Sequence, residues 1–502
     1  MTISCYGAPS HQHIKDSIMS SMSSFSSELS NLPKKPIPGQ YGLPFIGAIK
    51  DRWDYFYNEG KDEFFENRRR KYHSTVFRTN MPPGPFISPD SKVVCLLDAV
   101  SFPILFDMSK VEKLNVLDGT YHPSWSFTGG YRVCAYLDPS EPKHTSLKSY
   151  FMSIIAARHD NFIPLFQQCL YDLFFELESQ ITTKKHSSFN SLSDKMSFNY
   201  VFRLFCDKNP NETKVGSNGA NLFDKWLLCQ LAPLGTLGIL PKFLNLLEDL
   251  LLHTFLLPFF LVKSDYYKLY DTFYKSASSI LDEAENLGIK RDEACHNLVF
   301  LAGFNAYGGM KATFPMLIKW VGLAGEKLHR QLANEIRTVV KAEGGVTISS
   351  LEKMSLTKSV VYEALRIEPP VPFQYGRAKE DIVIQSHDAA FEIKKGEMIF
   401  GYQPFATKDP KIFEKPEQFV ANRFVGEGER LLKYVYWSNG RQTENPTAEN
   451  KQCPGKDLVV LLCRVMLVEF FLRYDTFRIE ARTSTFGSIV TFKSITPKAT
   501  TT

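Results

Sequence analysis

The segment LVVLLCRVMLVEFFLR, residues 458–473, predicts a helix that is apolar on nearly every face. A helix of this kind must be covered on all sides, so the chain has to build a large core around it. With 502 residues and 44% apolar composition, the chain has enough material for such a core. Cys453 stands directly before this helix in CPGKD, and twelve mostly polar residues separate it from Gly440.

The remaining elements indicate a mainly α fold with a smaller β part. Apolar residues recur at helical spacing at Leu328, Leu332, Ile336 and Val339, and Gly344 and Gly345 stop that helix. A second helix is predicted from a Ser355 cap to the residues before Pro369. The short runs DIVIQ and FEIKKGEMIFGY predict strands. Since no repeat or linker interrupts the chain, we expect a single domain over residues 32–502.

Composition excludes several classes of protein. The net charge of +5 comes from interspersed residues without a long basic run, so no nucleic-acid partner is expected. Nine scattered cysteines without C-x-x-C spacing do not predict a disulfide framework and favour a reducing compartment. Residues 1–31 are Ser-rich and are predicted to be disordered. A plastid leader has similar composition, but this segment lacks arginine and contains Asp16 and Glu28.

A second apolar run, Leu250 to Val262, is too short to span a bilayer. It has thirteen residues, whereas a spanning helix needs about 20, and Pro258 interrupts it. A buried helix and turn is the first interpretation of this run, and a membrane-surface patch is the alternative. We expect a location in the cytoplasm or peripheral on membranes or lipid bodies, with a plastid as the alternative.

The position of Cys453 suggests chemistry. Free backbone amides and the positive end of the helix dipole would stabilise a thiolate there, as a nucleophile or as a metal ligand. An inert core thiol is the alternative for any of the nine cysteines. Upstream, Glu363 and Arg366 share one helical face three residues apart, and Arg423 in ANRF follows them.

This order of E-x-x-R, a P-E-R-F-like box and a cysteine loop resembles the cytochrome P-450 superfamily. The resemblance implies the corresponding fold, with Cys453 as the axial thiolate ligand of haem b iron. It also implies that Glu363, Arg366 and Arg423 brace the cofactor-binding core. For the haem propionates it suggests His144, Lys148, Arg377 and Lys451, with a solvated surface role as the alternative for the lysines.

Two departures separate the chain from the monooxygenases of this superfamily. Their (A/G)-G-x-(D/E)-T segment places an acid and an alcohol beside dioxygen, whereas this chain has Asn305 and Ala306 there. Asparagine hydrogen-bonds but does not titrate near neutral pH. The spacing from Gly440 to Cys453 is also far longer than in the usual F-x-x-G-x-R-x-C pattern, which would remodel the face where reductases dock. Both departures indicate an enzyme that needs neither activated dioxygen nor delivered electrons.

The stretches FNAYGGMKATFP, PPGPFIS and NGRQTENPTAENKQCPGKD are similar to the plant branch that metabolises fatty-acid hydroperoxides. This branch contains hydroperoxide lyases, allene oxide synthases and divinyl ether synthases. The similarity implies a fatty-acid hydroperoxide substrate and homolytic O–O scission at ferric haem, without O2, NADPH or a reductase. Asn305 would orient the hydroperoxide by a hydrogen bond, unless it merely satisfies helix carbonyls near Gly308 and Gly309.

Leu117 in NVLDGTYHPS suggests the product. In this branch, allene oxide synthases commonly carry Phe at this position and lyases carry Leu, although Leu117 could serve packing alone. We therefore expect a hydroperoxide lyase acting on 9- and/or 13-hydroperoxides of linoleic or linolenic acid, with Pro372 and Phe373 lining the pocket. An allene oxide synthase or a divinyl ether synthase is the first alternative. A reductase-dependent monooxygenase and a non-catalytic haem or lipid carrier are the others.

Overall fold

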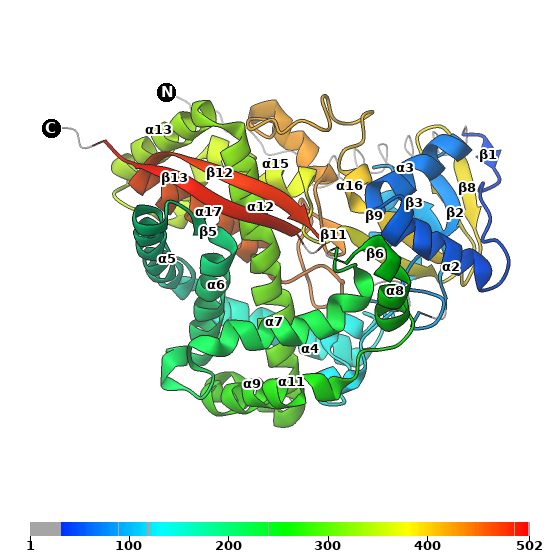
Figure 1. Ribbon diagram of the computed structural model, residues 1–502, viewed down its shortest axis with the longest axis horizontal. Helices are drawn as coiled ribbons and strands as arrows, with labels where there is room; N and C mark the ends of the chain where they lie inside the picture. Colours follow the sequence, from blue (N-terminus) through cyan, green and yellow to red (C-terminus); the bar gives the residue numbers. More distant parts are fainter. Residues whose placement is uncertain (1–31, 89, 118–120, 239, 486, 500–502) are drawn as a thin grey trace, which may run out of the picture.

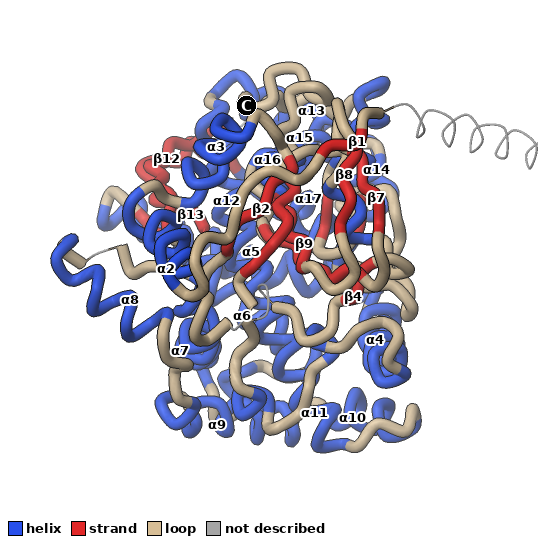
Figure 2. Tube along the Cα trace, turned by 90° about the vertical axis from the view of Figure 1, so that its right-hand side faces the viewer, coloured by secondary structure: helices blue, strands red, loops and turns tan. Residues whose placement is uncertain are grey.

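The structure, a computed structural model, describes residues 32–88, 90–117, 121–238, 240–485 and 487–499. The predicted disordered segment 1–31 lies outside these residues. Helices predominate, and Figure 2 places α9, α10 and α11 at the end of the molecule away from most strands. The α-helices are α2 (Ile46–Trp53), α3 (Lys61–Tyr72), α4 (Pro142–Ala157), α5 (Phe162–Lys184), α6 (Phe189–Cys206), α7 (Gly219–Leu231), α8 (Asn245–His253), α9 (Lys263–Ser276), α10 (Ser278–Asn286), α11 (Arg291–Phe300), α12 (Gly308–Ala324), α13 (Glu326–Glu343), α14 (Ile348–Glu352), α15 (Ser355–Ile367), α16 (Gln403–Ala406) and α17 (Lys456–Arg473).

The strands form small sheets at the edges of the helical core. The largest sheet has the order β2-β3-β9-β6-β4, and two three-stranded sheets have the orders β1-β8-β7 and β12-β13-β5. A short hairpin, β10-β11, precedes the cysteine loop. The strands are β1 (Lys34–Lys35), β2 (Val76–Asn80), β3 (Lys92–Leu96), β4 (Val111–Glu112), β5 (Ser187–Ser188), β6 (Phe373–Ala378), β7 (Ile382–Gln385), β8 (Ala390–Ile393), β9 (Met398–Tyr402), β10 (Tyr436–Trp437), β11 (Gly440–Arg441), β12 (Tyr474–Ser484) and β13 (Gly487–Pro497). The predicted strands over 381–385 and 391–402 are thus confirmed.

Helix α17 lies inside the core, as its composition predicts. Every residue from 462 to 471 is buried, and the helix contacts α5, α13 and α15. The site-forming helix runs through the middle of the molecule as α11, a π-helix over Leu301–Tyr307, and then α12 (Figure 1). Gly303 lets this helix approach α7 closely, because a Cβ there would lie 2.5 Å from the ring of Phe223.

Two predicted helix boundaries can be compared with the structure. α13 ends at Glu343, and Gly344 follows it with φ of 75°, which confirms the predicted stop. The predicted Ser355 cap is wrong, because Ser355 is the first helical residue of α15 and no side chain of the preceding residue caps the helix. Instead, the carboxylate of Glu335 accepts hydrogen bonds of 2.8 Å from the backbone amides of Leu356 and Thr357. A long-range carboxylate thus replaces the local cap.

The run Leu250–Val262 is not the buried helix and turn that its composition first suggests. Several of its side chains are exposed, including Phe255 at 60% and Phe260 at 73%. The face of α8 that points inward carries Glu248, Asp249 and His253, and Arg52 of α2 donates to both Asp249 and the His253 carbonyl. Polar anchoring therefore turns the leucines of α8 outward. None of the helices in the described ranges combines the length and the apolarity needed to cross a bilayer.

Candidate functional site

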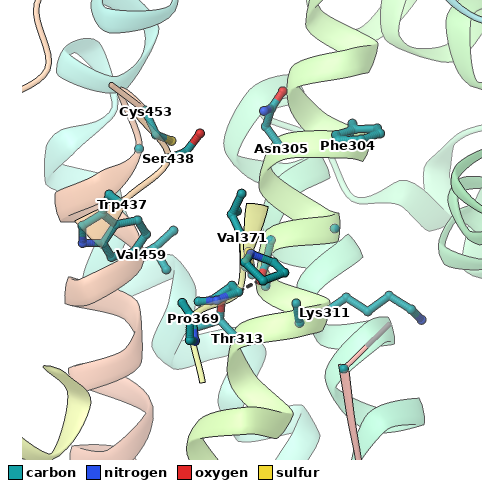
Figure 3. A pocket seen from close by; sticks show the side chains of 18 of the residues that line it. Phe304, Asn305, Lys311, Thr313, Pro369, Val371, Trp437, Ser438, Cys453 and Val459 are labelled. Carbon is teal, nitrogen blue, oxygen red and sulfur yellow. Dashed lines mark hydrogen bonds between the residues drawn. The ribbon is translucent and has the colours of Figure 1, made fainter. Parts of the chain in front are cut away.

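A cavity of about 1480 Å³ separates the start of α17 from the π-helix and α12. Cys453 and Asn305 approach it from opposite walls in Figure 3. Leu117, His144, Lys148 and Lys451 also line it, as do Pro372 and Phe373. One space therefore collects the predicted site residues, apart from Arg377.

The backbone before Cys453 is tightly turned. Hairpin β10-β11 reverses the chain at Asn439, which has φ of 62°, and Gly440 follows. A Cβ on Gly440 would lie 2.6 Å from the side-chain amide of Gln452, so a larger residue there would displace Gln452. The Cys453 amide then donates to the Ser438 carbonyl at 3.2 Å. These contacts hold the cysteine at the entrance of α17.

The long approach to Cys453 is organised around Asn450. Its side-chain oxygen accepts from the backbone amides of Thr447 and Gln452 at 3.2 and 3.1 Å, and its amide nitrogen donates to the Asn445 carbonyl at 2.9 Å. Lys148 of α4 donates to the same side-chain oxygen at 2.8 Å. The extra residues therefore form an ordered loop, which this hydrogen bond ties to α4.

The electrostatics of the thiol have opposing contributions. Burial raises the pKa of Cys453, whereas the backbone N–H of Gly455 and the positive charge of Lys148 lower it. The start of α17 thus stabilises the thiolate as expected, but burial has the larger effect on the pKa of Cys453 in the protein without a cofactor. A bound metal cation would deprotonate such a thiol, because its charge dominates the local field.

The cavity near Cys453 is lined by Lys113, Lys148, Lys451 and His144, and these basic side chains fit an anionic cofactor. The lysines Lys113, Lys148 and Lys451 form no salt bridge with a described carboxylate and donate to amide or carbonyl oxygens instead. Burial is the main cause that lowers the pKa of Lys113 to about 7 and of Lys451 to about 8. Buried cations of this kind need an anionic partner, which the propionates of haem would supply.

His144 provides a further sign of an anionic partner. It is buried, and its Nδ1 has no hydrogen-bond partner among the described residues. Burial, with the charges of Lys451 and Lys148, lowers the pKa of His144 to about 4. His144 lines the cavity, and a buried nitrogen without a protein partner is the kind of group that a bound cofactor can satisfy.

The structure places Arg377 elsewhere. It belongs to β6 and lines a separate small pocket of about 130 Å³. Its guanidinium donates to Asp90 at 3.0 Å and to the Gly396 carbonyl at 2.7 Å. Arg377 is therefore not among the residues that line the large cavity, and its role toward the cofactor stays a prediction without support from this geometry.

Asn305 lies in the π-helix, where the regular hydrogen-bond ladder is widened. Such helices are rare and occur frequently at functional sites. The Asn305 side chain is exposed to the cavity and makes no hydrogen bond with any residue that the structure describes. In the alternative role, the Asn305 side chain would donate to helix carbonyls near Gly308 and Gly309, and the described residues show no such hydrogen bond. Its amide is thus available to a ligand.

Leu117 is half-buried and packs against the main apolar core while lining the cavity. The next three residues of its segment, 118–120, lie outside the described ranges. Its side chain offers apolar contact at the wall, which is compatible with both the product-determining role and the packing role.

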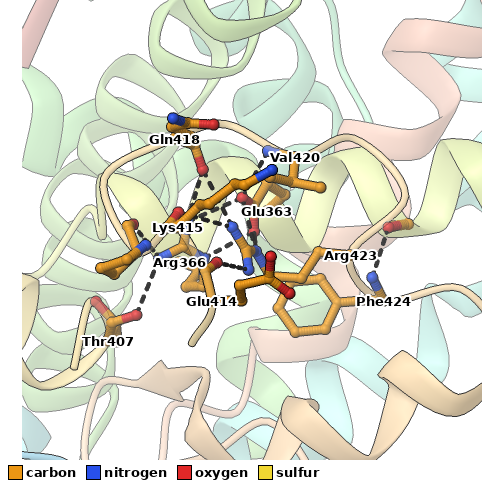
Figure 4. A network of polar contacts seen from close by, with 11 residues as sticks. Glu363, Arg366, Thr407, Glu414, Lys415, Gln418, Val420, Arg423 and Phe424 are labelled. Atoms are coloured by element: carbon orange, nitrogen blue, oxygen red, sulfur yellow. Dashed lines mark hydrogen bonds and ion pairs between the residues drawn. The ribbon is translucent and has the colours of Figure 1, made fainter. Parts of the chain in front are cut away.

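The predicted Glu363, Arg366 and Arg423 cluster forms behind the site (Figure 4). Arg423 Nε donates to both carboxylate oxygens of Glu363, at 3.0 and 2.9 Å. Arg366 also donates to the Thr407 and Pro416 carbonyls at 3.1 and 2.8 Å. The cluster ties α15 to the segment before the cysteine loop, and none of the three residues lines the cavity. This geometry supports bracing.

Sequence reasoning missed Lys113 and the π-helix. Lys113 lies four residues before Leu117, and no signal in the sequence marks it, because other polar residues such as Lys110 and Glu112 stand beside it. The π-helix has no comparable signal, because AGFNAYGG fits an ordinary helix equally well.

Known proteins resemble this chain over nearly its whole length. A family model described as Cytochrome P450 matches residues 326–475. The chain is 59% identical over 476 residues to allene oxide synthase 3 of Solanum lycopersicum, covering 94% of this chain and 96% of that protein. It is 56% identical over 478 residues to the chloroplastic allene oxide synthase 1 of that species, covering 95% and 89%. It is 55% identical over 478 residues to divinyl ether synthase CYP74D2 of Solanum tuberosum, covering 95% and 99%.

These matches agree with the geometry of the site, where one cavity is lined by the Cys453 thiol, several lysines and His144. Cytochrome P450 proteins hold haem through a cysteine thiolate, so haem is the cofactor that this site is built to bind. The chain belongs to the cytochrome P450 family, in the group that includes the allene oxide synthases and divinyl ether synthases.

Proposed function

We propose that this enzyme converts fatty-acid hydroperoxides and uses the O–O bond of its substrate in place of dioxygen and a reducing partner. The observation that carries the proposal is the unpaired Asn305 amide, which faces the cavity lined by Cys453. Ala306 follows it, so neither position offers the titratable acid or the hydroxyl that oxygen activation uses. Bound haem supplies the one-electron chemistry that splits a peroxide bond.

The residues of the chain have three tasks in this proposal. Asn305 hydrogen-bonds the hydroperoxide and fixes its position without exchanging a proton. The apolar walls exclude water, with Val371, Val459 and Phe304 among the lining residues (Figure 3). Lys113, Lys148, Lys451 and His144 hold the carboxylates of the cofactor. Each task follows from the donors and the burial described above.

For the product, we propose a hydroperoxide lyase that gives aldehydes and oxo-acids. Leu117 supports this proposal, because an aliphatic wall offers no aromatic ring beside a developing radical. Allene oxide synthase is the second candidate, and the 59% identity to allene oxide synthase 3 favours it. Divinyl ether synthase is the third, supported by the 55% identity to CYP74D2.

One assay separates these candidates. Purified ferric enzyme is given the 9- and the 13-hydroperoxide of linoleic acid, without NADPH or reductase, and the products are identified by mass spectrometry. Short aldehydes with oxo-acids support the lyase. Ketols identify an allene oxide synthase, and divinyl ethers identify a divinyl ether synthase. Strict dependence on NADPH and a reductase would overturn the proposed function.

We further propose peripheral association with a membrane through α8 and the residues after it. The exposed side chains of Leu250, Leu251, Phe255 and Phe260 are apolar, and the segment before α8 lines the cavity at Leu234 and Thr236. A lipid substrate could thus pass from the bilayer to the site. Co-sedimentation with phosphatidylcholine vesicles should fall for the double variant Leu250→Glu, Leu251→Glu. Unchanged sedimentation would reject this surface. The chloroplastic names of some relatives support a plastid as the location, beside the cytoplasm.

A further inference from the structure

We infer that Arg482, at the mouth of the cavity, binds the carboxylate of the substrate and holds it outside while the methyl end enters first. The inference rests on the proposed function and adds the orientation of the substrate to it. Arg482 belongs to β12, is exposed, and lines the cavity with Thr483, Ser484 and Thr485. These four residues lie at and just after the end of β12, and all four are exposed to solvent.

The other cations that line the cavity are already engaged. Arg158 pairs with Asp207 at 2.9 Å, Lys408 pairs with Glu417 at 2.8 Å, and Lys319 pairs with Glu368. Lys61 lies 5.1 Å from the centre of the Phe373 ring. Lys113, Lys148 and Lys451 surround Cys453 at the cofactor end. In contrast, the guanidinium of Arg482 makes no hydrogen bond or ion pair with any residue in the described ranges.

Lys311 is the strongest alternative to Arg482 as the partner of the substrate carboxylate, because it lies on α12 six residues after Asn305. Its Nζ contacts both Asp194 and Asp224, the latter at 3.1 Å. Figure 3 shows its side chain directed away from the gap between Cys453 and Asn305. One lysine with two carboxylates carries a net negative charge, which repels a third carboxylate. This pairing makes Lys311 a poor anchor for an acid.

The mouth also suits a carboxylate on physical grounds. A carboxylate loses much of its hydration when it is buried, so it is held most cheaply where solvent still reaches it. A guanidinium matches the two carboxylate oxygens with parallel donors. The hairpin that carries Arg482 is fixed at both sides of its tip: Thr485 donates to the Thr236 carbonyl at 2.8 Å, and Ser488 donates to Glu368 at 2.7 Å. Arg482 is thus a flexible side chain on a fixed support.

The test compares a free acid with its methyl ester in matched variants. Steady-state kinetics are measured for 13-hydroperoxy-linoleic acid and for its methyl ester with wild type, Arg482→Gln, Arg482→Lys and Lys311→Met. Arg478→Gln is the control, because Arg478 is exposed on the same strand and does not line the cavity. We expect Arg482→Gln to raise KM for the acid about 5- to 10-fold, with kcat and the ester unchanged. Arg482→Lys should restore part of the difference.

The inference would be overturned if Lys311→Met lost the preference for the acid over the ester while Arg482→Gln kept it. That result would indicate that the substrate enters with its carboxylate first. Equilibrium binding of linoleic acid, which has no peroxide, separates this inference from the proposed function. If no variant consumes hydroperoxide, weaker binding of linoleate to Arg482→Gln than to wild type still supports the role of Arg482 in binding the carboxylate. Equal binding in wild type and Arg482→Gln rejects it.

Discussion

Arg366 donates two parallel hydrogen bonds to Glu363, at 2.7 and 2.8 Å, and both side chains are fully buried. A buried bidentate pair is costly to break, because the remaining partner loses charge-assisted hydrogen bonds that water cannot replace. Since Arg423 shares the same carboxylate, one substitution disturbs three chain segments at once.

Arg366→Leu should therefore lower the free energy of unfolding by about 3–5 kcal/mol, because it leaves the buried Glu363 carboxylate with one guanidinium instead of two and removes the donor from the Thr407 and Pro416 carbonyls. Urea unfolding followed by circular dichroism measures the change, and haem content is recorded in parallel. Lys394→Leu is the control, because Lys394 pairs with Asp381 at an exposed site. Equal stability of Arg366→Leu and wild type would contradict the bracing role.

Cys453→Ser should abolish the thiolate-type spectrum of the reduced carbon-monoxide complex, because a hydroxyl is not a thiolate ligand. Cys134→Ser is the matched control, since Cys134 lines the same cavity but does not precede α17. A normal spectrum from Cys453→Ser would reject this residue as the ligand.

Asn305→Ala should lower kcat about 10- to 100-fold, because the variant removes the free donor beside the hydroperoxide. Haem content should stay the same, as the Asn305 side chain makes no hydrogen bond with the described residues. Thr313→Val serves as the comparison, because the Thr313 hydroxyl is already bonded to the Gly309 carbonyl at 2.7 Å. Equal kcat values for Asn305→Ala and wild type would leave Asn305 without a part in positioning.

Leu117→Phe should shift the product ratio from aldehydes towards ketols, because an aromatic ring would then line the wall beside the reacting chain. Product ratios are measured by mass spectrometry at equal substrate consumption. If the ratio does not change, Leu117 serves packing alone.

Haem affinity should fall as pH rises from about 6 to about 9. Burial and the charge of Lys451 lower the pKa of Lys113 to about 7, whereas Asp138 raises it. A bound cofactor carboxylate raises this pKa again, so binding takes up a proton. Affinity is then highest below pH 7, where Lys113 is already charged, and decreases as pH rises through that pKa.

Reconstitution of cofactor-free protein with hemin across this pH range measures the effect. Lys113→Met should flatten the dependence, whereas Lys394→Met, at an exposed ion pair, should leave it intact. An identical slope in wild type and Lys113→Met would show that another group carries the pH dependence.

The core and the bracing cluster could be predicted because their signals lie within single segments. The continuous apolar run of α17 requires burial, and Glu363 with Arg366 share one face of α15. Cys453 could be predicted for the same reason, as it stands at the start of that run. Its identification as a haem ligand depended on the order of several motifs rather than on one.

Sequence reasoning was least informative where contacts with distant residues decide the outcome. Arg52 anchors the acidic face of α8 from nearly two hundred residues away, and this contact reverses the expected burial of Leu250 and Leu251. Arg377 has Asp90 as a neighbour, which no local pattern could reveal. Lys113 looks like its polar neighbours Lys110 and Glu112 in the sequence, and its partners Gln374 and Asn439 come from the second half of the chain.

The reversed polarity of α8 has a practical meaning for handling this enzyme. Its outer leucines contribute little to internal packing, so exchanging them for charged residues should spare the architecture. A detergent-free, monodisperse preparation could be engineered by changing this one helix, which leaves the reaction chamber untouched.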